Sequence, residues 1–256
     1  MKLSVIICCY NERASIMEVI NRTQAVDLGP DWEREILVVD NYSTDGTREL
    51  LQTIDDPEIR TFFHDRNRGK GSSIRTGIAH MSGDYFFIQD ADTEYDPTDQ
   101  HHFCRHAQRT QAAAIFGSRV LGGETKSKYW RTLVGNRFVT WLANFLFGGQ
   151  LTDVATASKM ARADVVRPLH LESEQFDLDF ELPAKILMSG HQIDELAVSY
   201  RPRTYEEGKK IGFRDAIDAV VVMLRVRLGL SPVYQQLPGR ADIPVQTLGV
   251  SEVEND

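Results

Sequence analysis

The sequence predicts an α/β protein in which a mostly parallel, Rossmann-like sheet is flanked by helices. Apolar runs of strand length alternate with segments that carry apolar residues at helical spacing through the first half of the chain. Such alternation is typical of parallel strands joined by right-handed helical crossovers. Polar, acidic and glycine-bearing segments follow the first four runs, and ligands of parallel sheets bind beyond the carboxyl ends of the strands. The sequence therefore predicts one ligand site at one edge of the sheet.

The elements are expected in a fixed order. In the first half, strands are expected at Leu3–Cys9, Ile36–Val39, Ile59–Phe63 and Tyr85–Gln89, with helices at Ala14–Thr23, Thr47–Ile54 and Ser72–Met81. In the second half, strands are expected at Ala113–Phe116 and Ile193–Tyr200, with helices at Trp130–Phe147, Leu178–Met188 and Arg214–Leu228. We expect a single domain over residues 1–230, composed of a nucleotide-type half (1–117) and an α/β acceptor-type half (118–230). Residues 231–256 hold three of the nine prolines and lack helical periodicity, which indicates a loosely ordered tail.

Composition and charge exclude several classes of protein. The chain has 256 residues, 42% of them hydrophobic, which is enough for a sizeable core. Its formal net charge of −8 argues against binding to nucleic acid. Three cysteines, two of them adjacent, do not form a disulfide framework, and no apolar run reaches the roughly 20 residues of a membrane-spanning helix. These features predict a cytoplasmic protein.

Two aspartates follow the fourth predicted strand. Asp90 and Asp92 are separated by one residue, and residues i and i+2 of an extended chain face the same way. Two carboxylates aimed at one spot repel each other unless a cation lies between them, and proteins usually hold Mg²⁺ through one or two carboxylates plus substrate phosphates. Asp-x-Asp also occurs by chance on loops, but its position directly after a buried strand favours a site for a metal and a diphosphate.

Acidic residues after the first two strands fit a nucleoside. Glu12 follows the first strand and Asp40 follows the second, and an acidic residue near such positions accepts hydrogen bonds from the ribose in dinucleotide folds. In the segment after Asp40, Thr44 or Asp45 is expected to cap a helix. We therefore assign Glu12 and Asp40 to the predicted nucleotide site.

Competing nucleotide and nucleophile motifs are missing from the sequence. No GxxxxGK[ST] segment occurs, which excludes a P-loop, and no GxSxG segment occurs. Gly69 and Gly71 begin a GxGxxG pattern, but its third glycine position is Ile74 and the pattern follows the third strand. A dinucleotide-dependent dehydrogenase is therefore not expected.

Five segments of the chain form an ordered set of motifs. They are SVIICCYNE (4–12), VVDNYSTDGT (38–47), NRGKGSSIRTG (67–77), GDYFFIQDAD (83–92) and RTYEEGKKIGFRD (203–215). In this order they resemble the family 2 glycosyltransferases of the GT-A fold. Within that family they are most similar to the branch that contains dolichyl-phosphate mannose synthase and the polyprenyl-phosphate glycosyltransferases. The resemblance extends over about residues 3–228.

The resemblance implies a role for each residue that matches a family motif. It places the donor nucleotide at Tyr10, Glu12, Asp40, Lys70 and Asp90, and Mg²⁺ or Mn²⁺ at Asp90 and Asp92. It places the donor phosphates at Arg203, the acceptor phosphate at Arg119 and Arg131, and an acidic residue of the acceptor half at Glu181. Asp92, Arg203 and Glu181 are the expected catalytic residues.

The implied reaction is the inverting transfer of a hexose from GDP-mannose or a UDP-sugar to a polyprenyl or dolichyl phosphate. A divalent ion on Asp92 and the cation of Arg203 would stabilise the charge that grows on the leaving diphosphate. A lipid phosphate is already anionic and needs no general base. A saccharide or lipid hydroxyl acceptor needs one, and Asp179 or Glu181 is then the candidate. Both acceptors stay open, as does a non-catalytic nucleotide-binding subunit of a membrane complex.

The predicted helix 130–147 carries an aromatic stripe. Its members are Trp130, Val134, Phe138, Trp141 and Phe145, and Arg131 and Arg137 flank it. This pattern is typical of a helix at a lipid headgroup boundary, and equally of a helix packed in a core or a subunit interface. It predicts peripheral association with the inner face of a membrane or with a membrane subunit.

Overall fold

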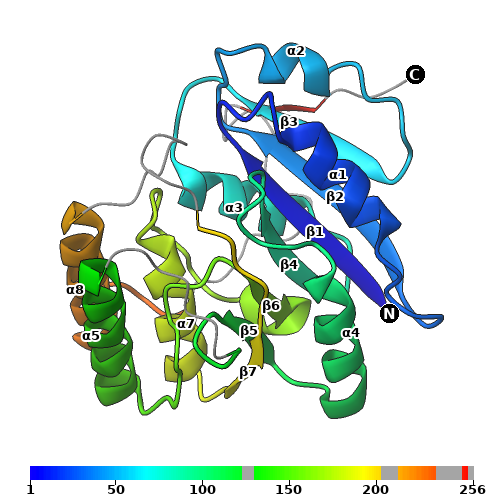
Figure 1. The fold of residues 1–256 in the computed structure, drawn as a ribbon. Coiled ribbons are helices and arrows are strands. Elements are labelled where there is room, and N and C mark those ends of the chain that lie inside the picture. The colour runs from blue at the N-terminus through cyan, green and yellow to red at the C-terminus, as the bar shows by residue number, and fades with distance from the viewer. Residues whose placement is uncertain (123–129, 203–212, 235–249, 253–256) are drawn as a thin grey trace.

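The computed structural model describes residues 1–122, 130–202, 213–234 and 250–252. These residues form one sheet of eight strands in the order β7-β5-β6-β4-β1-β2-β3-β8 (Figure 1). The strands are β1 (Lys2–Cys9), β2 (Glu33–Asp40), β3 (Ile59–His64), β4 (Tyr85–Asp90), β5 (Ala114–Ser118), β6 (Lys159–Arg162), β7 (Ile193–Ala197) and β8 (Val250–Glu252). β1 pairs in parallel with β2 and β4, and β2 with β3, so the carboxyl ends of these four strands share one edge. This is the edge at which the sequence predicts a ligand site.

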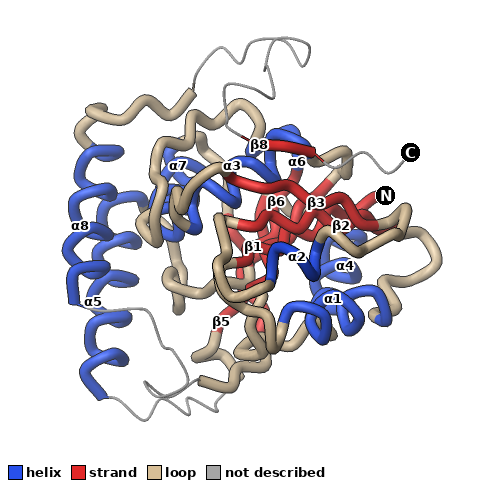
Figure 2. The backbone as a smooth tube through the Cα atoms, turned by 90° about the horizontal axis from the view of Figure 1, so that it is seen from above, coloured by secondary structure: helices blue, strands red, loops and turns tan. Residues whose placement is uncertain are grey.

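Helices cover both faces of the sheet (Figure 2). They are α1 (Ile16–Ala25), α2 (Thr47–Leu51), α3 (Lys70–His80), α4 (Asp99–Thr110), α5 (Trp130–Phe147), α6 (Ala163–Val166), α7 (Leu178–Met188) and α8 (Phe213–Arg227). Alternate residues of β1 point to opposite faces: Val5 packs in the core beneath α1, α2 and α4, while Ile6 packs in the core beneath α3, α6 and α7. Both cores are apolar because the sheet is buried on both sides.

A third apolar cluster joins α5 and α8 to α7. It contains Val139 and Ala143 of α5, Ala219 and Met223 of α8, and Phe180 of α7. α5 and α8 lie side by side at the end of the molecule away from β1, β2 and β3 (Figure 1). None of the helices in the described part of the chain combines the length and the apolar character needed to cross a bilayer.

The predicted fold class is confirmed, with differences in several elements. The helices at Trp130–Phe147 and Leu178–Met188 have the predicted bounds, whereas the helix from Thr47 ends at Leu51 rather than at Ile54. β6 was not predicted, and it joins the two halves because it pairs antiparallel with both β4 and β5. The predicted tail also contributes a strand: β8 pairs antiparallel with β3, while residues 235–249 and 253–256 lie outside the described residues.

Candidate active site

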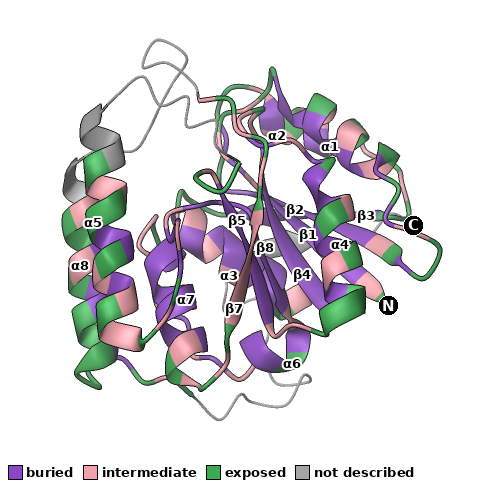
Figure 3. Cartoon of the chain, turned by 60° about the horizontal axis from the view of Figure 1, so that its bottom comes forward, coloured by how far each residue is buried: buried purple, intermediate pink, exposed green. Residues whose placement is uncertain are grey.

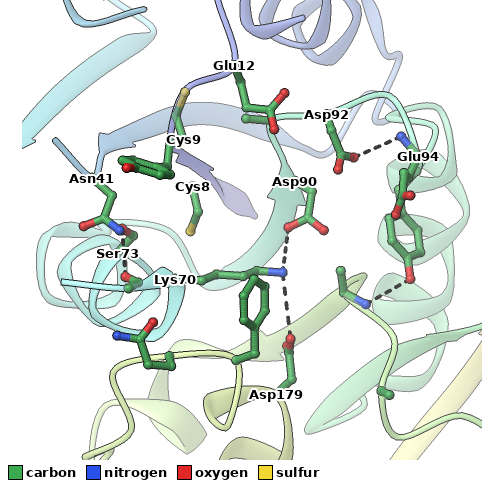
Figure 4. A pocket seen from close by; sticks show the side chains of 18 of the residues that line it. Cys8, Cys9, Glu12, Asn41, Lys70, Ser73, Asp90, Asp92, Glu94 and Asp179 are labelled. Atoms are coloured by element: carbon green, nitrogen blue, oxygen red, sulfur yellow. Dashed lines mark hydrogen bonds and ion pairs between the residues drawn. The ribbon is translucent and has the colours of Figure 1, made fainter. Parts of the chain in front are cut away.

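The carboxyl ends of the central strands open into one cavity of about 300 Å³. The segments after β1, β2, β3 and β4 line it with Glu12, Asn41, Lys70 and Asp90 (Figure 4). Tyr95 of the first half also lines it, and the second half of the chain completes the wall with Arg119, Phe176, Asp179 and Tyr200, among others. The cavity therefore lies where the nucleotide-type and acceptor-type halves meet.

Lys70 links the two halves across this cavity. Its Nζ lies 2.7 Å from Oδ1 of Asp90 and 3.8 Å from Oδ2 of Asp179, so the ammonium group sits between the two carboxylates (Figure 4). Burial by itself would lower the pKa of Lys70, but the two carboxylates outweigh burial and raise it. Lys70 is therefore charged at neutral pH.

A second, fully buried lysine holds Asp179 from the other side. Nζ of Lys159 lies 3.0 Å from Oδ1 of Asp179, and the same ammonium group donates to the carbonyl oxygen of Thr156. Burial would raise the pKa of Asp179, but Lys159 and Lys70 outweigh burial and lower it. Asp179 is therefore an ionised carboxylate between two ammonium groups.

The glycines around Lys70 allow the second half to approach this closely. A Cβ atom on Gly69 would lie 2.3 Å from the carbonyl oxygen of Glu174, and Gly69 has φ +91°. The backbone amide of Gly71 donates to the carbonyl oxygen of Gln175 at 3.1 Å. The Gly69-Lys70-Gly71 segment thus serves as a packing surface for the chain that leads to Asp179, which the GxGxxG comparison did not indicate.

The nucleotide side of the site differs in part from the sequence prediction. Tyr10 and Glu12 line the cavity as expected. Asp40 is fully buried: it accepts the backbone amide of Ser43 and lies 3.5 Å from Nε of Arg48, and burial raises its pKa. Asp40 is not among the residues that form the cavity wall. The next residue, Asn41, takes this place.

Asn41 was not predicted as a site residue, and a buried network fixes its amide. Its Oδ1 accepts the backbone amide of Arg68 at 2.8 Å and lies 3.0 Å from Nδ1 of His64, while its Nδ2 donates to Asn67 at 2.9 Å. Burial lowers the pKa of His64 to about 4, so the ring is neutral. Because Oδ1 of Asn41 can only accept, Nδ1 of His64 carries the proton. Nε2 lies 3.0 Å from the hydroxyl of Thr76, whose single proton can go to Nε2 or to the carbonyl oxygen of Ser72, also at 3.0 Å.

The two predicted metal ligands, Asp90 and Asp92, both line the cavity. Oδ1 of Asp92 accepts the backbone amide of Glu94 at 3.0 Å, which holds this carboxylate in place. Among the described residues, no group of three or more His, Cys, Asp or Glu side chains forms a cluster able to hold a metal ion. Two carboxylates, one of them also paired with Lys70, suit an ion such as Mg²⁺ that takes further ligands from substrate phosphates rather than a closed structural metal site.

The acceptor-side residues are divided. Arg119 lines the cavity, paired with buried Asp153. Glu181 does not line it: its carboxylate is fully buried, accepts the backbone amides of Glu172 and Ser173, and lies 2.7 Å from Nζ of Lys185. The structure thus places Asp179, rather than Glu181, at the cavity.

Two predicted arginines cannot be placed in the site. Arg203 lies outside the described residues. Arg131 belongs to the first turn of α5, and its side chain is not described. Their assignment to the donor and acceptor phosphates stays a prediction.

Residues 4–169, more than half of the chain, match the family model for glycosyl transferase family 2. The chain belongs to glycosyl transferase family 2. This finding confirms the family that the five sequence motifs predict.

Named relatives and a solved structure extend the comparison. The chain is 27% identical over 252 residues to undecaprenyl-phosphate mannosyltransferase of Micrococcus luteus. The match covers 94% of this chain and 99% of that protein. It is 38% identical over 103 residues to undecaprenyl-phosphate 4-deoxy-4-formamido-L-arabinose transferase of Salmonella paratyphi A. This second match covers 38% of this chain but only 31% of that protein.

The solved structure is glucosyl-3-phosphoglycerate synthase of Mycobacterium tuberculosis in complex with Mn²⁺, UDP-glucose and phosphoglyceric acid. It superposes with a TM-score of 0.61 at 16% identity, covering 88% of this chain and 79% of that chain. At this identity the similarity establishes the fold, which is the GT-A fold predicted from the sequence.

Proposed function

We propose that this protein is an inverting glycosyltransferase that moves a hexose from a nucleotide sugar to a polyprenyl phosphate. One observation carries the proposal: a single cavity holds the Asp90 and Asp92 pair together with Asp179, whose charge two lysines neutralise. The pair fits a metal bound to the donor diphosphate, and the neutralised aspartate, a weak base, fits an acceptor that needs no deprotonation. Family membership and the names of the two undecaprenyl-phosphate relatives support the same function.

The donor half of the proposal concerns the leaving diphosphate. Asp90 and Asp92 would hold Mg²⁺ or Mn²⁺ together with the donor phosphates, as fits two carboxylates that need further oxygen ligands. When bound, the ion supplies positive charge against the charge that develops on the leaving group. Tyr10, Glu12 and Asn41 line the part of the cavity proposed for the nucleoside of a UDP- or GDP-sugar.

The acceptor half depends on the state of Asp179. A hydroxyl acceptor must lose a proton, and an effective general base has a pKa near the working pH. The lysines lower the pKa of Asp179, which makes this carboxylate a weak base, and Glu181 is buried away from the cavity. A phosphate acceptor avoids the difficulty because its oxygen is already anionic. A single displacement by that oxygen inverts the anomeric carbon.

The acceptor phosphate is proposed to bind Arg119, with Arg131 as a second cation. Arg119 lines the cavity beside Tyr200, whose ring centroid lies 5.2 Å from the guanidinium carbon. A guanidinium group binds phosphate through two parallel hydrogen bonds, which suits it to orient one oxygen for attack. In this proposal Arg119 orients the acceptor and no side chain removes a proton.

A lipid acceptor requires contact with a membrane, and α5 and α8 provide a suitable face. Exposed residues cover the side of both helices that faces away from α7 (Figure 3), and many of them are apolar. These side chains are Val134, Phe138, Trp141 and Phe145 of α5, and Ile217, Val221 and Leu224 of α8 with Leu228 directly after it; each is between 40% and 72% exposed. The side chain of Trp130 is not described, but the other four residues of the stripe on α5 are not core residues, which leaves a membrane or a protein interface.

We assign this face to a bilayer that contains anionic lipids. Arg137, Arg225 and Arg227 are exposed beside the apolar stripes, although the chain as a whole carries a net charge of −8. Trp141 stacks between Phe138 and Phe145, with ring centroids 6.2 and 5.6 Å apart. Aromatic rings rimmed by arginine suit the headgroup region, whereas a second copy would bring the same cations to the same rim.

A transfer assay tests the proposed function. The purified protein is mixed with UDP- or GDP-hexoses and one of three acceptors, with and without Mn²⁺: farnesyl phosphate, as a short polyprenyl phosphate, farnesol, or a saccharide. We expect transfer to the phosphate only, in the presence of the ion, and a rate that rises with ionisation of the acceptor phosphate near about pH 6. Transfer to farnesol or to a saccharide would refute the acceptor assignment, and nucleotide binding without any transfer would favour a non-catalytic subunit.

A further inference from the structure

We propose that Asp153 is a positioning residue that fixes Arg119 for the anionic acceptor, and that Asn136 connects this pair to α5. The inference rests on the proposed function, because it takes Arg119 as a ligand of the acceptor phosphate. Neither Asp153 nor Asn136 belongs to the site residues that the sequence predicts, and neither lines the cavity.

The carboxylate of Asp153 holds Arg119 at three points. Nε of Arg119 donates to Oδ2 at 2.6 Å, Nη2 donates to Oδ1 at 2.7 Å, and the backbone amide of Arg119 donates to Oδ2 at 3.0 Å. Such a bidentate pair fixes the plane of the guanidinium group as well as its position. The ring of Tyr200 lies against the same group, 5.2 Å from its carbon. Arg119 thus enters the cavity in one orientation.

Asp153 is itself held by neighbouring elements. Its side chain is fully buried, and its Oδ1 also accepts Nδ2 of Asn136 on α5 at 2.9 Å. The carboxylate of Glu195 on β7 accepts the backbone amides of Thr152 at 2.7 Å and of Asp153 at 3.1 Å. Both the backbone and the side chain of Asp153 are therefore fixed. The carboxylate can transmit the position of β7 and α5 to Arg119.

This arrangement differs from simple charge neutralisation. A carboxylate that only offset the charge of Arg119 would need one contact, whereas Asp153 makes three contacts with Arg119 and a fourth with α5. α5 is also the helix that presents Phe138 and Trp141 outward. The path from the proposed membrane face to the acceptor cation is accordingly Asn136, Asp153 and Arg119.

The test separates acceptor binding from donor binding. Asp153→Asn and Asn136→Ala are compared with the wild-type protein for the KM of farnesyl phosphate, kcat, and the Kd of the nucleotide that supports transfer. We expect the acceptor KM to rise about tenfold in Asp153→Asn and about threefold in Asn136→Ala, with the nucleotide Kd changed by less than about twofold. Asp164→Asn, which removes the carboxylate of an exposed pair with Arg162, is the control and should leave all three values unchanged.

A double-variant cycle shows whether Asp153 acts through Arg119. In an Arg119→Met background, Asp153→Asn should add nothing to the acceptor KM. This double variant also removes both charges of the buried pair, so it remains informative if Asp153→Asn alone does not fold.

Three outcomes overturn the inference. The first is an unchanged acceptor KM in folded Asn136→Ala and Asp153→Asn. The second is an equal loss of nucleotide and acceptor binding, which would show a merely structural role. The third is that Asp153→Asn raises the acceptor KM as much in the Arg119→Met background as in the wild type. A wild-type protein that transfers nothing to farnesyl phosphate refutes the proposed function and this inference together, whereas an active wild type with unaltered variants refutes the inference alone.

Discussion

Replacing Lys70 by methionine tests whether the ion pairs of the cavity stabilise the folded protein in addition to shaping the site. Met keeps most of the length and the apolar stem of the side chain and removes only the ammonium group. Asp90 and Asp179 would then face each other across the position of Nζ without the cation that lies 2.7 and 3.8 Å from them. We expect the variant to fold and to be less stable.

The size of the loss follows from burial. The side chains of Lys70, Asp90 and Asp179 are 13%, 20% and 12% exposed. Removing one partner of a buried ion pair costs about 3–5 kcal/mol because the other charge stays buried. Asp179 keeps Lys159 at 3.0 Å, so we expect the lower end, about 3 kcal/mol. For a chain of this size that corresponds to a fall in Tm of about 6–12 °C.

The pH dependence distinguishes this cause from a general packing defect. Burial would raise the pKa of Asp179, but Lys159 and Lys70 lower it overall. A carboxylate with a lowered pKa contributes stability above its unfolded pKa of about 3.9 and loses that contribution as the pH falls through the folded value. The variant lacks part of this contribution. Its deficit should therefore be full at pH 7 and smaller below about pH 4.

Urea denaturation of the wild type and of Lys70→Met, at pH 7 and below about pH 4, measures the difference in the free energy of unfolding. The matched control is Arg22→Met, which removes a cation 2.7 Å from Asp96 at the surface, where an ion pair contributes about 0–1 kcal/mol. A variant as stable as the wild type at pH 7, or a deficit that is equal at the two pH values, would refute the reasoning.

Three further predictions concern the metal, the buried network and the membrane face. Asp92→Asn should lower ion-dependent turnover about 100-fold or more with an unchanged Tm; full turnover would contradict the metal assignment. Because burial lowers the pKa of His64 from 6.5 to about 4, the folded state should lose up to about 3 kcal/mol as the pH falls between these values. His64→Gln should show a smaller pH slope in denaturation, and an identical slope would exclude His64 as the cause. Trp141→Glu should abolish sedimentation with phosphatidylglycerol vesicles, whereas Gln150→Glu, an exposed control of equal charge, should not. Retained binding by Trp141→Glu would exclude this face.

The fold could be predicted where the pattern is local. β1 and β4 are apolar runs of strand length, and α7 is an apolar-rich segment of helix length, so their bounds agree closely with prediction. β6 could not be found in this way because it has only four residues and begins with Lys159, a charged residue that is buried through its contact with Asp179. β8 has three residues, and only its pairing with β3 makes it a strand.

The site shows the same division at the level of single side chains. Asp90 ends β4, Asp92 and Glu12 lie on the segments after β4 and β1, and Lys70 begins the helix after β3, so the topology brings all four to the cavity. However, the presence of an acidic residue at the end of a strand does not tell whether its side chain points into the cavity. Asp40 ends β2, lies 3.5 Å from Nε of Arg48 and does not line the cavity, whereas the next residue, Asn41, lies on the cavity wall.

Helical geometry gives a similar rule for the acceptor half. Asp179 and Glu181 are two residues apart on α7, and the 3.6-residue period places such residues on nearly opposite sides. Only one of the two carboxylates can therefore face the cavity, and this could have been predicted from their spacing in the sequence. Which one faces it depends on Lys70 and Lys159, two lysines from distant segments.

The charges of the cavity give a reason for metal dependence that is independent of the Asp-x-Asp motif. Among the described residues that line the cavity, the cations are Lys70 and Arg119, and each already has a carboxylate partner, Asp90 and Asp153 respectively. Asp179 is likewise matched by Lys159. In the proposed reaction a diphosphate and an acceptor phosphate would enter together and bring several negative charges, of which the paired lysine and arginine can offset only part. Bound ions are often the largest local charges in a phosphate site, so a divalent ion on Asp92 would supply the positive charge that these side chains lack.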